Sequence, residues 1–434
     1  MSWSRTASWS RLTLVPSKNL EVILVKKVVL VAAFVVAVAV VVLFAQPIVV
    51  GVVGPFEQEA GSWIRFGSTY AAEAINADGG ILGREIKLIF EDDGVSAEKL
   101  KSAMAKLVLR DRVDFLLGGY SSGSVLGAMN DLPRYKVIWL GTGAASPQVI
   151  NLIENDYESF KYYFRVGTLD STKQAVSIGE FIANDLGPKY GITRVGIITL
   201  DWTYSRDIAE TAAAICEEAG MEIVFRSYFS EGTTDFAPIF TRAEQAGAQI
   251  IIDAIVTDDG IQFVKQWYSI KPNFAIVGAV GPALKPEFFE QTNGMCVYET
   301  SAYPNGGPAN LTGKTLEYFD DFQEKYGIFP GFAAFSAHDA LYVLKAALEK
   351  VGNTKDTEAI ISALKETDFP GGPENLTTVA PVKFTEFHDL EFGGLYAQGI
   401  LFQWQVNDGI PEWIAVYPEL FKTGDWQKPH WVEF

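Results

Sequence analysis

Cysteine and histidine are scarce in this sequence, with 2 and 3 of them among 434 residues. The two cysteines, Cys216 and Cys296, are too far apart for a CxxC zinc or redox motif, and they form either one disulfide or two buried thiols. The histidines, His338, His388 and His430, are scattered along the chain, which argues against a metal centre built on imidazoles. We therefore expect no metal and no other cofactor.

Basic residues are also few, with 35 Lys and Arg against 53 Asp and Glu, for a net charge of −18. Five of the basic residues and only one of the acidic residues precede Pro47, so the remainder carries a net charge of −22. Such an acidic body repels phosphate groups, which argues against nucleic acid as a partner. Hydrophobic residues make up 48% of the chain, which excludes disorder as its main state.

The first 46 residues have the features of an export signal. Lys26 and Lys27 precede an uncharged apolar run of 18 residues, Val28–Ala45. The run is about as long as a short membrane-spanning helix, so the segment is either a cleaved signal peptide or a retained membrane anchor. In both cases we expect residues 47–434 to work outside the cytoplasmic membrane, tethered through residues 28–45 if the segment is retained.

From Pro47 onward, short β-branched runs alternate with segments of helical periodicity. This order predicts parallel strands with crossover helices, and therefore an α/β fold. The pattern restarts at residues 164–169, so we expect two doubly wound sheets in succession, each forming one lobe. The expected strands are 48–53, 86–90, 115–117, 137–140, 195–199, 223–228, 250–255, 275–277, 401–405 and 413–417. The expected helices are 62–77, 97–109, 124–132, 174–184, 207–220, 236–246, 260–268, 335–350 and 357–366.

Ligands of open α/β sheets collect at the carboxyl ends of the strands, so the loops there are the candidate site. The loop after strand 115–117 contains glycines with Ser121 and Ser122, whose hydroxyls and neighbouring amides suit a carboxylate. The loop after strand 137–140 consists of small residues, among them the candidate ligand-binding residues Gly143, Ala144, Ala145 and Ser146.

In the second half of the chain, Tyr204 follows one strand, and Asp258 and Asp259 follow another. Asp170 lies where the pattern restarts. We expect these side chains to complete a site between the lobes. Asp170 and Asp259 have an equally plain structural explanation, because each precedes a predicted helix that it would cap.

Residues 119–123 also match the GxSxG pattern of a nucleophile elbow, between a strand and a helix. A serine esterase built on Ser121 would use a later acid and one of the three histidines. The loop follows the third strand of its sheet, and no His-Gly-Gly segment precedes it, so binding without covalent chemistry is the favoured interpretation.

Several segments together resemble the type I periplasmic solute-binding proteins, in particular the leucine/isoleucine/valine-binding branch of ABC importers. The matching segments are Val53-Gly54-Pro55-Phe56, residues 71–83 (AAEAINADGGILG), Glu91-Asp92-Asp93, Phe164-Arg165 with Asp170, Thr234-Asp235-Phe236, Phe263-Val264-Lys265-Gln266, Ala337-His338-Asp339-Ala340 and residues 381–390. Their order and spacing cover nearly all of the chain after residue 46. The resemblance implies two lobes joined by a hinge of three chain crossings, which close on a small amino acid or related carboxylate.

The resemblance also assigns roles to residues. Ser122 takes the position of the serine that holds the ligand carboxylate, and Gly143 that of the residue whose backbone also contacts it. Ala145 stands where the family has a threonine, with Ser146 beside it. Tyr204 matches a tyrosine of the second lobe.

One departure concerns the ligand's ammonium group. The glutamate that pairs with it in the family aligns near Val280. An unpaired ammonium in a closed site is costly, so Asp258, Asp259 or Asp170 would have to replace the glutamate. If none does, the ligand is a carboxylate or amide without an α-ammonium group.

The sequence therefore predicts a solute-binding protein, not an enzyme, that delivers a small ligand to the membrane subunits of an ABC permease. A ligand-sensing receptor of the same fold is the alternative. We expect residues 47–167 and 298–390 to form the first lobe, and residues 168–297 and 391–434 the second.

Overall fold

The computed structural model describes residues 26–28, 46–303, 307–369, 382–393 and 396–434. Ile48–Phe434 forms one compact unit. The predicted export segment lies almost wholly outside the described residues. Among the residues that are described, no helix is long and apolar enough to cross a membrane.

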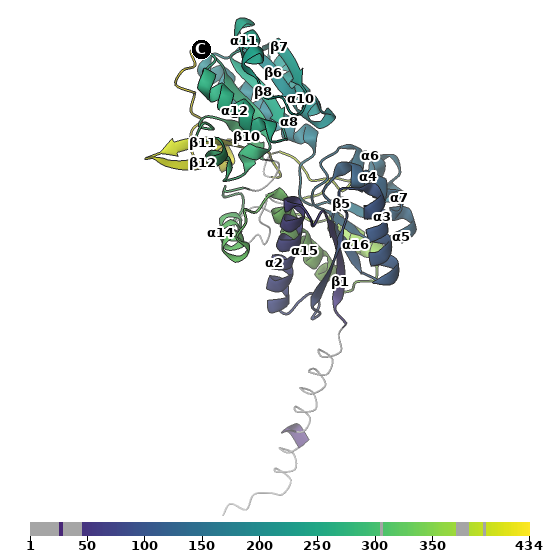
Figure 1. Ribbon diagram of the computed structural model, residues 1–434. Helices are drawn as coiled ribbons and strands as arrows, with labels where there is room; N and C mark the ends of the chain where they lie inside the picture. The colour runs from purple at the N-terminus through teal and green to yellow at the C-terminus, as the bar shows by residue number, and fades with distance from the viewer. Residues whose placement is uncertain (1–25, 29–45, 304–306, 370–381, 394–395) are drawn as a thin grey trace, which may run out of the picture. The chain divides into compact units, whose positions relative to one another are not determined.

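Two sheets organise the compact unit, as the sequence predicts (Figure 1). We call each sheet with its covering helices a lobe. In the described residues the first sheet has the order β2-β1-β3-β4-β5, and all its strands are parallel. Its strands are β1 (Ile48–Gly54), β2 (Ile86–Asp92), β3 (Phe115–Gly118), β4 (Trp139–Gly141) and β5 (Tyr163–Arg165).

The second sheet has the order β12-β11-β10-β9-β8-β6-β7. It is parallel from β7 to β10, and an antiparallel pair, β11 and β12, extends it at one edge. Its strands are β6 (Arg194–Leu200), β7 (Glu222–Phe229), β8 (Ile250–Ile255), β9 (Ala275–Val280), β10 (Thr300–Tyr303), β11 (Ile400–Asn407) and β12 (Ile410–Tyr417).

Helices cover both faces of each sheet. In the first lobe α2 and α15 pack together on one face, and α3 and α4 on the other (Figure 1). In the second lobe α8 packs against α10, and α11 against α12. The helices are α2 (Glu59–Ala77), α3 (Ala97–Ala105), α4 (Ser122–Met129), α5 (Leu132–Tyr135), α6 (Gln148–Asn155), α7 (Tyr157–Phe160), α8 (Ser171–Glu180), α9 (Gly187–Tyr190), α10 (Thr203–Glu218), α11 (Ala237–Gln245), α12 (Asp259–Ile270), α13 (Phe288–Gln291), α14 (Thr315–Tyr326), α15 (Phe332–Val351) and α16 (Thr357–Lys365).

The chain passes between the sheets three times, which agrees with the expected hinge. It leaves the first sheet after β5, returns after β10 to form α14 and α15, and leaves again before β11. The predicted lobe boundaries stay a prediction, although β10, which lies within residues 298–390, hydrogen-bonds in the second sheet.

One expectation about the strands was wrong. The pattern that seemed to restart at residues 164–169 is β5, which pairs with β4 and completes the first sheet. The error arose because a buried parallel strand has the same β-branched and aromatic composition in either sheet. Helices α6 and α14 were not predicted; both are amphipathic and lie beside loops rich in small residues.

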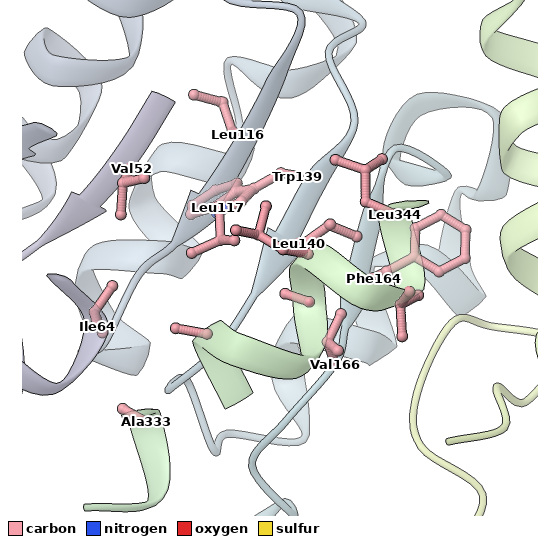
Figure 2. Close-up of a cluster of buried hydrophobic side chains, with 14 of the residues drawn as sticks. Val52, Ile64, Leu116, Leu117, Trp139, Leu140, Phe164, Val166, Ala333 and Leu344 are labelled. Carbon is pink, nitrogen blue, oxygen red and sulfur yellow. The ribbon is translucent and has the colours of Figure 1, made fainter. Parts of the chain in front are cut away.

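Large apolar side chains fill both lobes. Figure 2 shows Leu117, Leu140 and Phe164 of neighbouring strands beside Leu344 of α15, and all four are fully buried. The second sheet has a core on each face. Cys216 and Cys296 are buried free thiols, which resolves the question that the sequence left open.

Candidate functional site

Two loops at the carboxyl edge of the first sheet are joined by a hydrogen bond. The loop after β3 ends at Ser122, the first residue of α4, and the loop after β4 ends near Ser146. The Ser146 amide donates to the Ser122 hydroxyl oxygen at 3.0 Å. The structure thus brings together Ser122 and Ser146, two of the predicted ligand-binding residues.

Small residues allow the two loops to approach each other. A Cβ atom added to Gly143 would lie 2.9 Å from the Cα atom of Tyr120, so a larger residue would push the loops apart. Ala144 is fully buried. The Ala145 carbonyl accepts a hydrogen bond of 2.9 Å from the Ser171 amide at the start of α8, which links this loop to the second lobe.

The hydroxyl of Tyr204, at the start of α10, donates to the Gln174 side-chain oxygen at 2.8 Å. Gln174 in turn donates to the Leu169 carbonyl at 2.7 Å, so it is held in place. Burial raises the pKa of Tyr204, and the nearby Tyr120 of the first lobe adds to the shift. Tyr204 is therefore a neutral hydrogen-bonding group near the loop after β3.

Two of the three candidate carboxylates are engaged by nearby groups. Asp170 caps α8 by accepting from the Lys173 amide at 2.9 Å. Asp259 accepts from the Gly232 amide at 3.0 Å and from the Thr257 hydroxyl at 2.7 Å. The capping explanation is confirmed for Asp170. It was wrong for Asp259, whose carboxylate accepts from loop groups and not from helix amides, because Asp258 is the N-cap residue of α12. A role for either carboxylate toward a ligand stays a prediction.

Asp258 and Val280 differ in their surroundings. Asp258 lies at the N-terminus of α12 with its side chain exposed, and it makes no side-chain cap bond there. Val280 is fully buried in the core of the second lobe, and its amide donates to the Ser301 hydroxyl oxygen at 2.9 Å. Val280 offers no charge to an ammonium group.

The nucleophile-elbow pattern is not accompanied by a catalytic triad in the described part of the chain. His338 contacts Asp339 at 2.8 Å within α15, and His388 contacts the Tyr163 carbonyl at 3.0 Å. His430 packs against aromatic rings. Across the described residues, none of these imidazoles is hydrogen-bonded to Ser121.

Arg165, a fully buried residue at the end of β5, was not among the predicted site residues. Its guanidinium donates to the Ser146 carbonyl at 2.7 Å, directly behind the joined loops. A lone arginine in the apolar segment Tyr162–Val166 was the signal that could have drawn attention to it.

A recess of about 550 Å³ lies beside the chain passages between the lobes. The residues that line the recess are Pro147, Ile150, Asn151, Glu154, Asp170, Lys173, Thr385, Glu386, Phe387, Asp389 and Glu391.

Among all the described residues, no group of three or more His, Cys, Asp or Glu side chains could hold a metal ion.

Comparison with known proteins identifies the family. The model of the periplasmic binding protein family matches residues 47–392. The Leu/Ile/Val-binding protein BraC3 of Rhizobium johnstonii is 24% identical over 346 residues, which cover 79% of this chain and 89% of that protein. The chain therefore belongs to the periplasmic binding protein family.

Solved structures share the fold. A putative branched-chain amino acid ABC transporter protein from Silicibacter pomeroyi has a TM-score of 0.79 at 19% identity, covering 89% of this chain and 100% of that one. A solute-binding protein of an ABC transporter from Rhodopseudomonas palustris, in complex with 3,4-dihydroxybenzoic acid, has a TM-score of 0.67 at 20% identity, covering 88% and 98%. The predicted fold class is confirmed.

The matched family and the curated relative are binding proteins. The chain is therefore a binding protein of the periplasmic type and not an enzyme, and the esterase alternative is set aside. Its family places it outside the cytoplasmic membrane.

Proposed function

We propose that this protein captures a small carboxylate, a branched-chain amino acid or a close relative, and delivers it to the membrane subunits of an ABC importer. The carrying observation is the bond between the Ser146 amide and the Ser122 hydroxyl at the N-terminus of α4. Hydroxyls and free amides at a helix N-terminus favour an anion, because the peptide dipoles point their positive ends at it.

The second lobe completes the proposed site through Tyr204. A ligand shifts the balance between open and closed forms only if it contacts the two forms differently. A carboxylate held by Ser122 and the backbone near Gly143 would gain contacts with Tyr204 when the lobes close around it. Binding then needs no covalent step.

Two ligand classes fit the proposed site. The name of the Rhizobium johnstonii relative indicates leucine, isoleucine or valine. The ligand of the Rhodopseudomonas palustris structure is an aromatic carboxylate without an ammonium group. The buried Val280 favours a carboxylate without an ammonium group. If the ligand is an amino acid, we expect the exposed Asp258 to pair with its ammonium group, because Asp170 and Asp259 already accept other hydrogen bonds.

Calorimetric titration with leucine and with its deaminated analogue, 4-methylpentanoate, distinguishes these classes. The protein is first unfolded and refolded to remove any bound ligand. Binding of leucine alone means that an acidic side chain pairs with the ammonium group. Binding of the analogue as well as or better than leucine means a site for carboxylates. Binding of neither contradicts the proposed ligand class and leaves the family membership intact.

The adjacent serines provide a matched pair of variants. Ser122→Ala removes a hydrogen bond to a charged ligand, a loss of about 1.5–3 kcal/mol, and should weaken binding roughly 10- to 100-fold. Of the two serines in this loop, the proposal assigns the carboxylate contact to Ser122 alone, so Ser121→Ala should leave the dissociation constant unchanged. Equal effects of the two variants, measured by the same titration, would contradict the proposed carboxylate contact.

The location of the protein in the cell follows from the same proposal. We expect residues 28–45 either to be removed during export or to tether the protein at the outer face of the membrane. Extraction of membranes with alkaline carbonate separates these outcomes, because it releases a cleaved protein and retains an anchored one.

A further inference from the structure

A chain of polar contacts runs from the proposed carboxylate site toward the passages between the lobes. The Ser146 amide donates to Ser122, and the Ser146 carbonyl accepts from the Arg165 guanidinium at 2.7 Å. One residue therefore connects the proposed ligand loop to a charged group that is completely buried.

Arg165 faces two buried carboxylates. Its Nη1 atom lies 3.6 Å from Asp170 Oδ2 and 3.5 Å from Asp389 Oδ1. Both distances exceed the usual length of a charged hydrogen bond. Lys173 bridges the same carboxylates, with its Nζ atom 3.2 Å from Asp170 Oδ2 and 2.6 Å from Asp389 Oδ2. These four residues, which we call the hinge cluster, balance two positive and two negative charges.

The members of the hinge cluster come from different parts of the hinge. Arg165 ends β5 in the first sheet, and Asp170 caps α8, which packs in the second lobe. Asp389 precedes the last passage, where Lys173 also donates to the Leu390 carbonyl at 3.1 Å. The cluster thus ties the first passage to the last one, although they are more than 200 residues apart (216 between Lys173 and Asp389).

The surroundings of the hinge cluster leave it room to rearrange. Asp170, Lys173 and Asp389 line the recess of about 550 Å³, so that side of the cluster is not closely packed. A buried charge is costly when its partners move away. Small changes in the angle between the passages therefore change the electrostatic energy of the hinge cluster. The distances from Arg165 to the two carboxylates are long enough to become shorter in another state of the hinge.

We propose that Arg165, Asp170, Lys173 and Asp389 are positioning residues that couple occupancy of the ligand loop to the angle of the hinge. This inference rests on the proposed function for the position of the ligand. A carboxylate at Ser122 and Ser146 displaces the Ser146 peptide, and Arg165 follows because it is bonded to the carbonyl of that peptide. Its distances to Asp170 and Asp389 then change, and so does the preferred orientation of the two passages.

The test measures the distance between the lobes directly. Spin labels at Ser102→Cys in α3 and Thr241→Cys in α11 place one probe on the exposed surface of each lobe. The native Cys216 and Cys296 are buried and do not compete for the label. Double electron–electron resonance then gives the interlobe distance distribution, with and without leucine or 4-methylpentanoate.

Asp389→Asn removes one negative charge from the hinge cluster with little change in shape. We expect a shifted or broadened distance distribution in the ligand-free protein, and a dissociation constant weakened at least fivefold, within the usual range of coupling between sites. Lys173→Gln should act in the same direction and serves if Asp389→Asn does not fold. Lys173→Arg keeps the positive charge that Lys173→Gln removes, so its interlobe distance distribution should match that of the wild-type protein.

Glu222→Gln is the matched control, because it breaks an exposed ion pair with Arg194 (2.9 Å) at the far side of the second lobe. A lower melting temperature with an unchanged distance distribution in both cluster variants would overturn the inference and leave the cluster a purely structural role. If neither probe ligand binds the wild-type protein, the proposed ligand class fails, but the ligand-free distances still decide whether the cluster sets the hinge.

Discussion

At the scale of single residues, His388 shows how burial tunes a side chain near the hinge. Its ring stacks on Phe164 with a centroid distance of 3.9 Å and contacts the Tyr157 hydroxyl at 3.2 Å. Burial lowers the pKa of His388 to about 4. The folded protein therefore holds a neutral imidazole at this position at neutral pH.

This shift predicts a loss of stability in acid. Because the folded pKa of His388 lies below the unfolded value of about 6.5, the unfolded chain binds the proton first as the pH falls, and stability drops between about pH 6.5 and pH 4. His388→Asn keeps a residue that tolerates the positive φ of 67° and should show a smaller decrease in melting temperature from pH 7 to pH 5.

The control for this measurement is His430→Asn, which changes an exposed imidazole. It should reproduce the wild-type pH profile. A wild-type slope in the His388 variant would show that the acid sensitivity arises elsewhere.

At the residue scale, the sequence predicted that Ser122 and Ser146 lie in loops at the carboxyl ends of strands, and the structure joins these two loops by a hydrogen bond. Their contact with a ligand stays a prediction. The partners of Arg165 could not be predicted, since periodicity carries no information about which distant acids approach a buried charge.

At the scale of secondary structure elements, β8 carries an unusual residue. Asp253 lies among isoleucines in a fully buried strand, opposite Gly278 of β9. An added Cβ on Gly278 would lie 2.1 Å from the Asp253 carboxylate, so glycine makes room for it. Glu299 is also fully buried and interacts electrostatically with Asp253, and its side chain accepts a hydrogen bond from the Ser301 hydroxyl.

Burial raises the pKa of Asp253 to about 8, and burial together with Asp253 raises that of Glu299. Because the folded pKa of Asp253 lies above the unfolded value, the folded state keeps its proton longer as the pH rises. Stability should therefore fall from about pH 4 to pH 8, by up to about 1.4 kcal/mol per pH unit for this group.

Asp253→Asn removes this titration and should flatten the alkaline side of the stability profile, measured by urea unfolding between pH 5 and pH 8. Asp207→Asn, at an exposed position of α10, is the control and should leave the profile unchanged. An unaltered slope in the Asp253 variant would mean that the carboxyl group is ionised in the folded protein.

The strands and most helices could be predicted because their signals are local. β-Branched runs such as β1 and β8 are buried on both faces of their sheets, so their composition alone indicates a strand. The sheet to which β5 belongs could not be predicted, since pairing with β4 depends on the path of the chain between them and not on the composition of β5.

At the scale of the whole molecule, we consider an exposed ion pair that links the two lobes. Lys285, which follows β9 of the second lobe, pairs with Glu59 at the N-terminus of α2 in the first. The two side chains are 39% and 44% exposed, so the pair contributes little, about 1 kcal/mol or less. The pair matters because it joins the two lobes directly.

If this pair helps to hold the closed form, Lys285→Gln should weaken the binding of leucine or its analogue by less than about fivefold at low salt. The difference from wild type should vanish at 1 M salt, where the Debye length is about 3 Å. Lys314→Gln, which breaks an exposed pair with Glu317 inside one lobe, is the control for calorimetric titration at both salt concentrations. A salt-independent effect would contradict an electrostatic link.

The sequence by itself determined the α/β class, the alternation of strands and helices, the family resemblance and the loops that carry the candidate site, because each depends on neighbours along the chain. Only the tertiary structure decided which charges meet. Arg165, Lys173, Asp170 and Asp389 form one cluster because the first and the last passage of the chain converge beside the first sheet. Free thiols, the buried Asp253 and the apolar surroundings of Val280 were likewise decided by packing between segments far apart in sequence.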